Sequence, residues 1–531
     1  MLPKTQRIFI ALGIILVFYC AIIGKLLFIS FSKNFDNNEI ISRYIKIKPP
    51  IKDRNGIILA TNLQTYSIYV NPQEILDINE FITKLMPFAF KDLEKKVDKY
   101  IKNKSTFMWL KRHVSPTEEH KIRELGLSGL YCIKDLKRFY PHSEISAHVV
   151  GYVDLDSNAL AGLEKILEIP EYSEVKELYS NIDIRIQGAA HHALSNSVRL
   201  NEAESGVAIV MDVTNGEILA SVSIPDFDPN MLQHAEQDAT INRASMAVME
   251  MGSTFKVLSM AIGFDTNSVS LDEKFHVSQP LTIGRFTITD YKPRSSVIST
   301  AQVLAYSSNI GIAAIANRFG IKQQAEYFKR FKLLQKVESD FPEITNPLFP
   351  PLAKWNHASL ITMSYGYGIA VTPLHAITAL ASTINGGFLI PPQFIKNEKQ
   401  TIKKSKILKS KTVRKMQHLL HYVVNHSTTK KFAIDGYCIG GKSGTAEVLQ
   451  HGQYVKNMNN GYFFSVFPCN KPKYAVYVVI RNSKKNTYNK HITTGGIVAG
   501  PVAKNIMLSI INIMNMQHIK ECDDIQNKII N

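Results

Sequence analysis

The sequence is poor in cysteine and has none of the spacings that build a metal centre. Its five cysteines include no Cys-x-x-Cys pair, and the chain has no His-Glu-x-x-His motif. An odd, sparse cysteine count excludes a disulfide framework, and the missing spacings argue against a zinc site. Cys438 and Cys469 could pair if the chain is exported, but we expect both to be partly buried thiols.

Arginine is also scarce, although the chain is basic. The 62 Lys and Arg against 45 Asp and Glu give a net charge of +17, yet only 15 of the basic residues are arginines. Proteins that read phosphates and bases favour the arginine fork. The chain has no basic patch interleaved with aromatic residues, no zinc-finger spacing and no RNA-binding signature. We therefore predict no nucleic-acid partner.

Neither an internal repeat nor a phosphate-cradling glycine loop is present. With 45% hydrophobic and 20% charged residues, the composition is that of a folded protein, which excludes a disordered or wholly membrane-embedded chain. At about 150 residues per domain, the 531 residues predict two or three folded units.

One long apolar run lies near the N-terminus. It starts at Ile8, is interrupted only by Lys25 and continues to Phe31. We predict a single transmembrane helix over residues 8–31, preceded by a cytoplasmic N-terminus over residues 1–7. A cleaved signal peptide is the alternative, because small residues follow the run. Basic residues flank both ends, so charge alone leaves the orientation open.

Two segments of different character follow the apolar run. Residues 32–178 mix strand-like and helical pieces without an evident nucleophile, which indicates a non-catalytic pedestal domain. Residues 179–508 predict a larger α+β domain that opens with a hairpin over residues 207–222, because two apolar strands flank an Asn-Gly turn there. Residues 509–531 are a polar C-terminal tail.

A serine and a lysine three positions apart begin a stretch typical of a buried helix. Positions i and i+3 share a helix face, so the Lys256 amine is expected beside the Ser253 hydroxyl. A serine needs an adjacent base to act as a nucleophile, and lysine serves only when burial or a nearby positive charge keeps it neutral. The spacing alone is weak. It recurs, as expected for solvated surface pairs, at Ser30/Lys33, Ser173/Lys176 and Ser427/Lys430.

Two further elements follow in order. Ser307-Ser308-Asn309 is a Ser-x-Asn triplet, and Lys442-Ser443-Gly444-Thr445 is a Lys-Ser-Gly element. Three such elements in this order are a specific signal of a serine acyl-transfer enzyme. The small residues around Lys442 would let a substrate backbone approach a strand closely.

With these elements the chain resembles the class B penicillin-binding proteins, membrane-anchored serine D,D-transpeptidases of peptidoglycan synthesis, over nearly its whole length. Further segments that carry the resemblance are Asp53-Arg-Asn-Gly56, Arg138-Phe-Tyr-Pro141, Gly162-Leu-Glu164, Tyr306-Ser-Ser-Asn-Ile-Gly311 and Ser364-Tyr-Gly-Tyr-Gly-Ile369. Ile283-Gly284-Arg285 and Thr289-Asp290 resemble the division-specific, FtsI-like branch more than the elongation branch. The chain departs from many relatives at Met251, where proline is common, and at Tyr367, where histidine is common.

The resemblance implies a penicillin-recognition domain, similar to serine β-lactamases, with an antiparallel sheet flanked by helices over residues 179–508. The segment 32–178 would be the family's dimerisation or pedestal domain. Ser253 would attack the carbonyl between the two terminal D-alanines of a stem peptide, with neutral Lys256 as base and D-alanine as leaving group. Backbone N–H groups of Ser253 and Thr445 would form the oxyanion hole.

The resemblance also assigns the remaining site residues. Ser307 and Asn309 would relay the proton to the leaving amine and hold the substrate amide. Lys442, as an ammonium, would help keep Lys256 neutral. The substrate carboxylate would bind at Lys442 and at Ser443, Gly444 and Thr445. An amine from a neighbouring stem peptide would then resolve the acyl-enzyme, and no metal or organic cofactor would be needed.

The same resemblance implies the protein's location and partners. Its substrates lie outside the cytoplasmic membrane, so the catalytic domain is expected in the periplasm, anchored by one pass through the inner membrane. β-Lactams would acylate the protein covalently. Division proteins, including an FtsW-like glycosyltransferase, are expected partners. The alternatives are an elongation-type transpeptidase, a β-lactamase or penicillin sensor, and a catalytically silent division scaffold.

Overall fold

A computed structural model describes residues 47–518, and before them residues 3, 6, 9–10 and 12–28. Gaps in the first range are residues 89, 91, 173, 284–285, 292–295, 398–402 and 451–452. Parts of several predictions therefore lie outside the described residues: most of residues 1–7, the end of the apolar run, Gly284-Arg285 of the branch motif and residues 519–531 of the tail.

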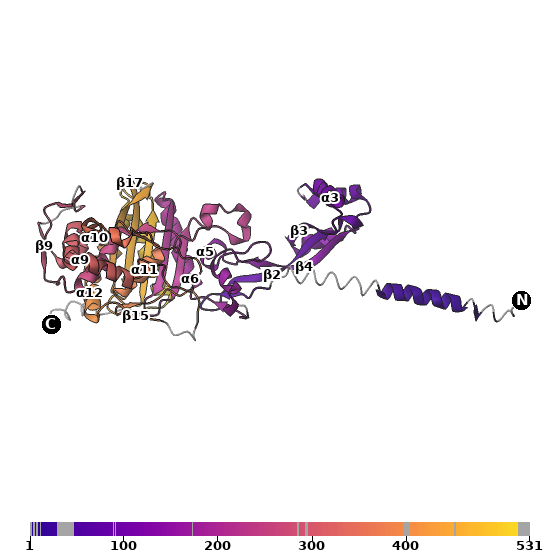
Figure 1. The fold of residues 1–531 in the computed structure, drawn as a ribbon, viewed down its shortest axis with the longest axis horizontal. Coiled ribbons are helices and arrows are strands. Elements are labelled where there is room, and N and C mark those ends of the chain that lie inside the picture. Colours follow the sequence, from indigo (N-terminus) through magenta and orange to yellow (C-terminus); the bar gives the residue numbers. More distant parts are fainter. Residues whose placement is uncertain are drawn as a thin grey trace. The chain divides into compact units, whose positions relative to one another are not determined.

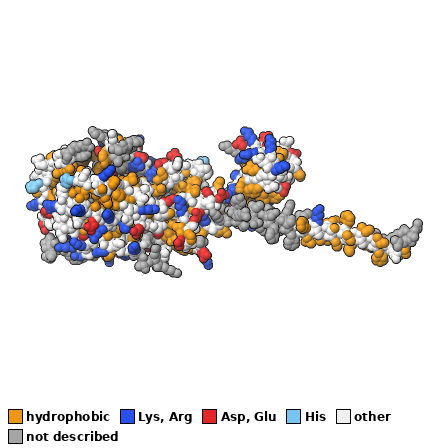
Figure 2. All heavy atoms as spheres, in the orientation of Figure 1, with side chains coloured by type: hydrophobic (Ala, Val, Ile, Leu, Met, Phe, Trp, Pro, Cys, Tyr) orange, Lys and Arg blue, Asp and Glu red, His pale blue; other side chains and the backbone are white. Residues whose placement is uncertain are grey.

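The apolar run near the N-terminus contains a helix at Leu12–Phe28. Its side chains are exposed, and Figure 2 shows apolar side chains along its length. A longer apolar stretch of helix, Gly495–Ile513, is half buried. Residues such as Val502 and Ile506 place it in a hydrophobic core, so its apolar character is explained by packing within the protein.

The chain divides into two compact units. The first comprises Met1–Lys48, Asn62–Phe139 and Val153–Asn158, and the second comprises Pro49–Thr61, Tyr140–Tyr152 and Ala159–Asn531. Three segments that precede residue 179 thus pack with the second unit. Asp53 helps to hold the first of these segments to the second unit, because its carboxylate accepts hydrogen bonds from the backbone of Asn55, Ile57 and Ile184.

The first unit builds a small sheet with helices on one face. Its strands are β3 (Met108–Val114), β4 (Leu130–Phe139) and the later part of β2 (Ile58–Val70), with which both others pair. Its helices are α2 (Ile78–Leu85), α3 (Leu93–Lys102) and α4 (Pro116–Arg123). Ile68, Val70 and Met108 on the strands pack on Phe81 and Val97 of the helices, which forms the core of this unit.

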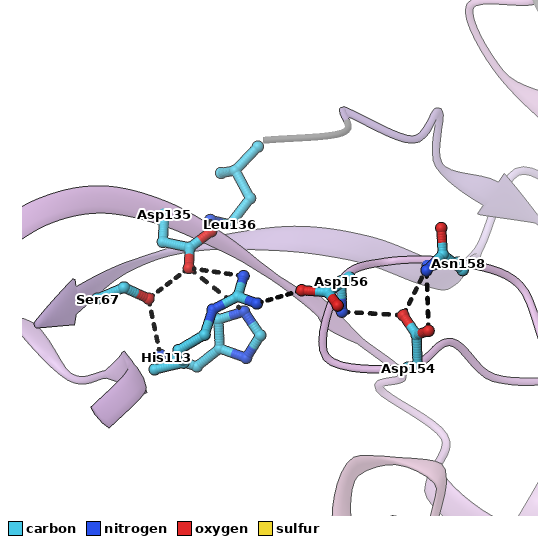
Figure 3. Close-up of polar contacts among 8 residues, drawn as sticks. Ser67, His113, Asp135, Leu136, Asp154, Asp156 and Asn158 are labelled. Carbon is cyan, nitrogen blue, oxygen red and sulfur yellow. Dashed lines mark hydrogen bonds and ion pairs between the residues drawn. The ribbon is translucent and has the colours of Figure 1, made fainter. Parts of the chain in front are cut away.

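A buried polar network ties the strands of the first unit together (Figure 3). The Asp135 carboxylate of β4 accepts hydrogen bonds from the Ser67 hydroxyl of β2 and, at 3.2 Å, from the Arg112 guanidinium of β3. Arg112 also donates to Asp156 at 2.5 Å. His113 Nε2 lies 3.6 Å from Asp135, and burial lowers the pKa of this imidazole.

The second unit is built on a five-stranded antiparallel sheet of strand order β16-β17-β18-β6-β7. The strands are β6 (Ser205–Asp212), β7 (Ile218–Ile224), β16 (Gly440–Gln450), β17 (Gln453–Phe467) and β18 (Tyr474–Arg481). The predicted hairpin is β6–β7, and it is confirmed. Its turn needs glycine at Gly216, where φ is +86° and a Cβ would lie 2.4 Å from the Pro391 carbonyl oxygen.

Helices cover both faces of this sheet, and Figure 1 shows it between α9, α10 and α12 and the helix α6. The helices are α5 (Ala147–Val150), α6 (Ile184–Leu200), α7 (Lys256–Asp265), α8 (Thr300–Ala305), α9 (Asn309–Arg330), α10 (His357–Ser364), α11 (Pro373–Ser382), α12 (Ser410–His426), α13 (Gly495–Val498) and α14 (Gly500–Ile513). Alternate strand residues enter two cores, one with α6 and α14 and the other with α7, α11 and α12. Burial on both faces explains why β6 reads as a continuous apolar run.

Short strand pairs complete the second unit. They are β1 (Ile51–Lys52) with β5 (Leu178–Tyr179), β8 (Met249–Glu250) with β13 (Ala370–Val371), β9 (Lys274–His276) with β12 (Val297–Ser299), β10 (Leu281–Ile283) with β11 (Phe286–Ile288), and β14 (Phe388–Leu389) with β15 (Ser405–Lys406). The predicted α+β class with an antiparallel sheet flanked by helices is confirmed. Strand β16 is an edge of the main sheet, and the candidate site lies beside it.

Candidate active site

Ser253 lies on a tight 3₁₀ turn, Gly252–Phe255, that leads directly into α7. The turn backs onto β16, because a Cβ on Gly252 would lie 2.6 Å from the Thr445 carbonyl oxygen. Gly252 also has φ of +52°, which favours glycine. The Thr254 hydroxyl donates to the Met251 carbonyl at 2.7 Å and braces the turn. The predicted helix therefore exists, but its first turn is 3₁₀.

Lys256 is fully buried at the first position of α7. Its Nζ donates to the Ser307 carbonyl at 2.5 Å and to Asn309 Oδ1 at 2.7 Å, and lies 3.2 Å from Ser307 Oγ. Burial lowers the pKa of Lys256 well below its ordinary value, and the charge of Lys442 lowers it further, while Asp290 opposes both effects. These surroundings favour the neutral amine, the form that can accept a proton.

Ser307 and Asn309 lie at the junction of α8 and α9. Ser307 has φ of +59°, a left-handed conformation that is uncommon for a residue with a side chain. Ser308 caps α9, because its hydroxyl accepts a hydrogen bond from Gly311 N at 2.9 Å. Asp290 accepts hydrogen bonds from the Ser308 hydroxyl and the Asn309 backbone, both at 2.6 Å. These contacts fix the strained junction.

Lys442, on β16, also contacts the Ser307 hydroxyl. Its Nζ donates to Ser307 Oγ at 3.1 Å and to the Ser443 carbonyl at 2.6 Å. Burial lowers the pKa of Lys442 to about 7. Among the described residues neither Lys442 nor Lys256 forms an ion pair with a carboxylate. The Ser307 hydroxyl thus lies between two buried amines.

The rest of the Lys-Ser-Gly element forms the edge of β16 beside the nucleophile turn. A Cβ on Gly444 would lie 2.9 Å from Thr254 N, so a larger residue would push the strand off the turn. Ser443 and Thr445 are half-buried and, two residues apart, share one side of the strand. The Thr445 hydroxyl accepts a hydrogen bond from Gly495 N at 3.1 Å and still has a proton to donate.

The structure brings four of the predicted site residues into direct contact. Lys256, Ser307, Asn309 and Lys442 meet through direct contacts, whereas Ser253 joins them through its place on the turn before Lys256. Among the described residues the half-buried Ser253 hydroxyl has no hydrogen-bond partner. A half-buried hydroxyl, a neutral amine one turn away and a cation nearby are the parts of a serine acyl-transfer site.

Sequence reasoning missed two carboxylates at this site. Asp290 holds the α8–α9 junction from a separate hairpin, and no spacing rule connects it to Ser308. Glu250 lies three residues before Ser253, and its side chain accepts a hydrogen bond from Gly368 N at 2.6 Å. The nearness of Glu250 to the serine in the sequence was a signal that could have marked it.

No metal site is evident where the chain is described: no group of three or more His, Cys, Asp or Glu side chains there could hold an ion. Cys438 and Cys469 are buried thiols, and Cys469 Sγ donates to the Gln417 carbonyl at 3.2 Å. Both lie in the hydrophobic core beside the sheet.

Comparison with known families gives two matches. Residues 206–508 match the penicillin binding protein transpeptidase domain, and residues 50–174 match the penicillin-binding protein dimerisation domain. Similar whole proteins include the probable peptidoglycan D,D-transpeptidase FtsI of Caulobacter vibrioides, 30% identical over 90% of this chain and 83% of the relative. The probable peptidoglycan D,D-transpeptidase PenA of Neisseria gonorrhoeae is 28% identical over 98% of this chain and 96% of the relative.

Solved structures show the same fold. Penicillin-binding protein 3 of Mycobacterium tuberculosis, in complex with aztreonam, superposes with a TM-score of 0.71 at 20% identity, and the match covers 89% of this chain and 97% of that one. The fold predicted from the sequence is thereby confirmed. The stage V sporulation protein D of Bacillus subtilis is also similar, 27% identical over 88% of this chain and 78% of the relative.

Proposed function

The chain belongs to the class B penicillin-binding proteins, and from that premise we propose that it cross-links peptidoglycan stem peptides at the division septum. The observation that carries this proposal is the Ser307 hydroxyl, which lies within hydrogen-bond distance of both Lys256 and Lys442. Lys256 itself follows Ser253 by about one helical turn. This arrangement unites three sequence elements into one proton-transfer path. The relatives' names, peptidoglycan D,D-transpeptidases, supply the reaction class.

Acylation begins at Ser253. Neutral Lys256 takes the hydroxyl proton while Ser253 Oγ bonds to the carbonyl carbon between the two terminal D-alanines. The negative oxygen of the tetrahedral intermediate is stabilised by the backbone N–H groups of Ser253 and Thr445. The C–N bond then breaks, the amine receives a proton, and D-alanine leaves.

Ser307 supplies the route for that proton. Its hydroxyl contacts Lys256 at 3.2 Å and Lys442 at 3.1 Å, so a proton taken by Lys256 can pass through Ser307 to the leaving amine. Lys442, as an ammonium, binds the substrate carboxylate together with Ser443, Gly444 and Thr445. Asn309, anchored to Lys256 at 2.7 Å, holds the substrate amide.

Mass spectrometry of the intact protein after penicillin treatment tests the chemistry. We expect a single adduct that digestion maps to Ser253 and that is absent from Ser253→Ala. An adduct on another residue would overturn the site. Rapid hydrolysis of the penicillin in place of a long-lived adduct would favour the β-lactamase alternative.

The division role rests on relatives and on the Ile283 and Thr289-Asp290 motif. The Escherichia coli peptidoglycan D,D-transpeptidase FtsI is 28% identical over 88% of this chain and 84% of the relative. Replacing the native gene by one encoding Ser253→Ala should give filaments that fail to divide. Rounded cells would instead indicate an elongation enzyme, and normal division would support the silent scaffold.

The exposed apolar helix Leu12–Phe28 supports a membrane anchor with the catalytic domain, residues 179–508, in the periplasm. In this arrangement residues 32–178 are the pedestal that docks division proteins such as an FtsW-like glycosyltransferase. Protease added to spheroplasts should digest the catalytic domain. Protection of that domain in intact spheroplasts would contradict the topology.

A further inference from the structure

A carboxylate without a cationic partner lies beside the nucleophile turn. Glu250 is half-buried in β8, and burial raises the pKa of its side chain. Its oxygens accept hydrogen bonds from Gly368 N at 2.6 Å and from the Tyr454 hydroxyl at 3.0 and 3.1 Å. Within the described part of the chain no lysine or arginine forms an ion pair with it. A carboxylate that is removed from water in this way is strongly stabilised by a nearby cation.

Aromatic side chains neighbour this carboxylate, and Tyr454 contacts it through its hydroxyl. Tyr367 and Tyr454 pack edge to face with ring centroids 5.4 Å apart, and Tyr365 packs on Tyr367 at 5.7 Å. Tyr454 is 43% exposed, so the group opens to solvent on one side. Ring faces beside a carboxylate attract an organic ammonium, which combines ionic and cation–π contacts.

The same residues contact the catalytic strand and the nucleophile turn. The Tyr367 hydroxyl accepts a hydrogen bond at 3.3 Å from Glu447 N, two residues beyond Thr445 on β16. The neighbouring Gly366 lies against the turn, because a Cβ added at this position would lie 2.1 Å from the Gly252 carbonyl oxygen. The carboxylate and its rings therefore lie beside both the nucleophile turn and β16.

We propose that Glu250, with the rings of Tyr367 and Tyr454, binds the ammonium group of the acceptor strand before it reacts with the acyl-enzyme. This inference rests on the proposed transpeptidase function and names the substrate class of its second step: a primary amine that arrives protonated. The carboxylate of Glu447, exposed next to Tyr367, adds negative potential to the same approach.

The chemistry that follows balances with groups already present. The bound ammonium releases one proton to solvent, and the neutral amine moves to the acyl carbon. Its nitrogen bonds to that carbon as the Ser253 Oγ–carbon bond breaks. The remaining excess proton passes through Lys256 to Ser253 Oγ, which restores the hydroxyl and leaves an amide cross-link.

Glu250→Gln tests the negative charge alone, because the amide oxygen of glutamine can still accept hydrogen bonds from Gly368 N and the Tyr454 hydroxyl. The acyl-enzyme is formed from a D-alanyl thioester and partitioned between two acceptors: Nα-acetyl-lysine amide, whose only amine is cationic, and methanol, which is uncharged. We expect the KM for the amine to rise about tenfold or more, because the variant loses one charge-assisted contact with the ammonium. Methanolysis and acylation by penicillin should stay within about twofold of wild type.

Two matched variants and a probe sharpen the test. Tyr454→Phe keeps the ring, whereas Tyr454→Ala removes it, and only the second should weaken amine use, by about two- to fivefold. Tetramethylammonium, a cation that cannot act as a nucleophile, should compete with the amine but not with methanol.

Equal losses with methanol and amine, or lost penicillin acylation in Glu250→Gln, would show that Glu250 only positions the turn and would overturn the acceptor site. An unchanged KM for the amine would overturn it as well. Failure of the wild-type protein to acylate Ser253 would instead refute the proposed function itself.

Discussion

Each compact unit contains a buried cluster of ionisable side chains, and these two clusters treat charge in opposite ways. In the first unit the guanidinium of Arg112 lies between two carboxylates, Asp135 and Asp156. In the second unit the amines of Lys256 and Lys442 are buried among neutral oxygens from Ser307, Asn309 and Ser443.

The difference in ionic partners indicates a different role for each of these two clusters. A buried charge with matched partners keeps its normal protonation and holds strands together. A buried amine without a carboxylate has a lowered pKa, which makes it unfavourable for stability and useful for proton transfer. We therefore interpret the first network as structural, whereas the proposed function gives the second network a chemical role.

The largest expected effect is on the chemistry of the second unit. Lys256→Met removes the proposed base but fills a similar volume, so acylation by labelled penicillin should slow by about 10²- to 10⁴-fold. The melting temperature should change little, because removal of the desolvated amine offsets the loss of its hydrogen bonds to Ser307 and Asn309. Lys411→Met, at an exposed position on α12, is the matched control and should change neither quantity. A Lys256→Met protein that acylates normally would contradict the assignment.

The reverse outcome is expected in the first unit. Asp135→Ala leaves Arg112 only 10% exposed without its buried partner, which should destabilise the unit by about 3–5 kcal/mol. Hydrogen exchange in β3 and β4 would report the loss, while acylation of Ser253 should stay unchanged. Asp156→Ala, which removes a carboxylate that is 60% exposed, should cost less than about 1 kcal/mol. Similar losses in both variants would mean that the network is not held by Asp135.

The unmatched amines should also make the reaction pH-dependent. In the proposed mechanism acylation needs Lys256 neutral, so the rate should fall as pH drops through its lowered pKa. It also needs Lys442 charged, so the second-order rate constant should fall above the pKa of about 7, by about tenfold per pH unit. A pH profile of penicillin acylation measures both limbs. A flat profile above pH 7 would show that a substrate-free Lys442 is not the titrating group.

A small effect, close to that of Asp156→Ala, is expected for a neutral member of the first network. Ser67→Ala removes one buried hydroxyl, while Asp135 keeps Arg112 and accepts from Leu136 N at 2.8 Å. We expect a loss of about 1 kcal/mol in urea unfolding of this unit. A loss as large as that of Asp135→Ala would mean that Ser67, not Arg112, is the main partner.

Short-range sequence patterns predicted the helices and hairpins that form through contacts between residues close in the sequence. The β6–β7 hairpin follows from two apolar runs and an Asn-Gly turn. A Lys-rich amphipathic pattern over residues 88–104 predicts a helix, and the observed helix, α3 (Leu93–Lys102), is shorter. Its start is shortened by Asp92, whose φ of +54° is not helical, a feature that periodicity cannot reveal.

Contacts between distant segments were beyond such reasoning. Asp290 caps α9 from another hairpin, and Glu250 meets Tyr454 across about two hundred positions. Neither pair follows a helical or strand period, so no window of sequence contains the information.

The sequence by itself determined which chemistry is available: a serine, two lysines, a Ser-x-Asn triplet and a glycine-rich strand, in a fixed order. Only the tertiary structure decided that the Ser307 hydroxyl lies between the two amines and that both amines are buried. The physical reason is that a pKa depends on desolvation and on neighbouring charges, and packing brings those neighbours from far along the chain.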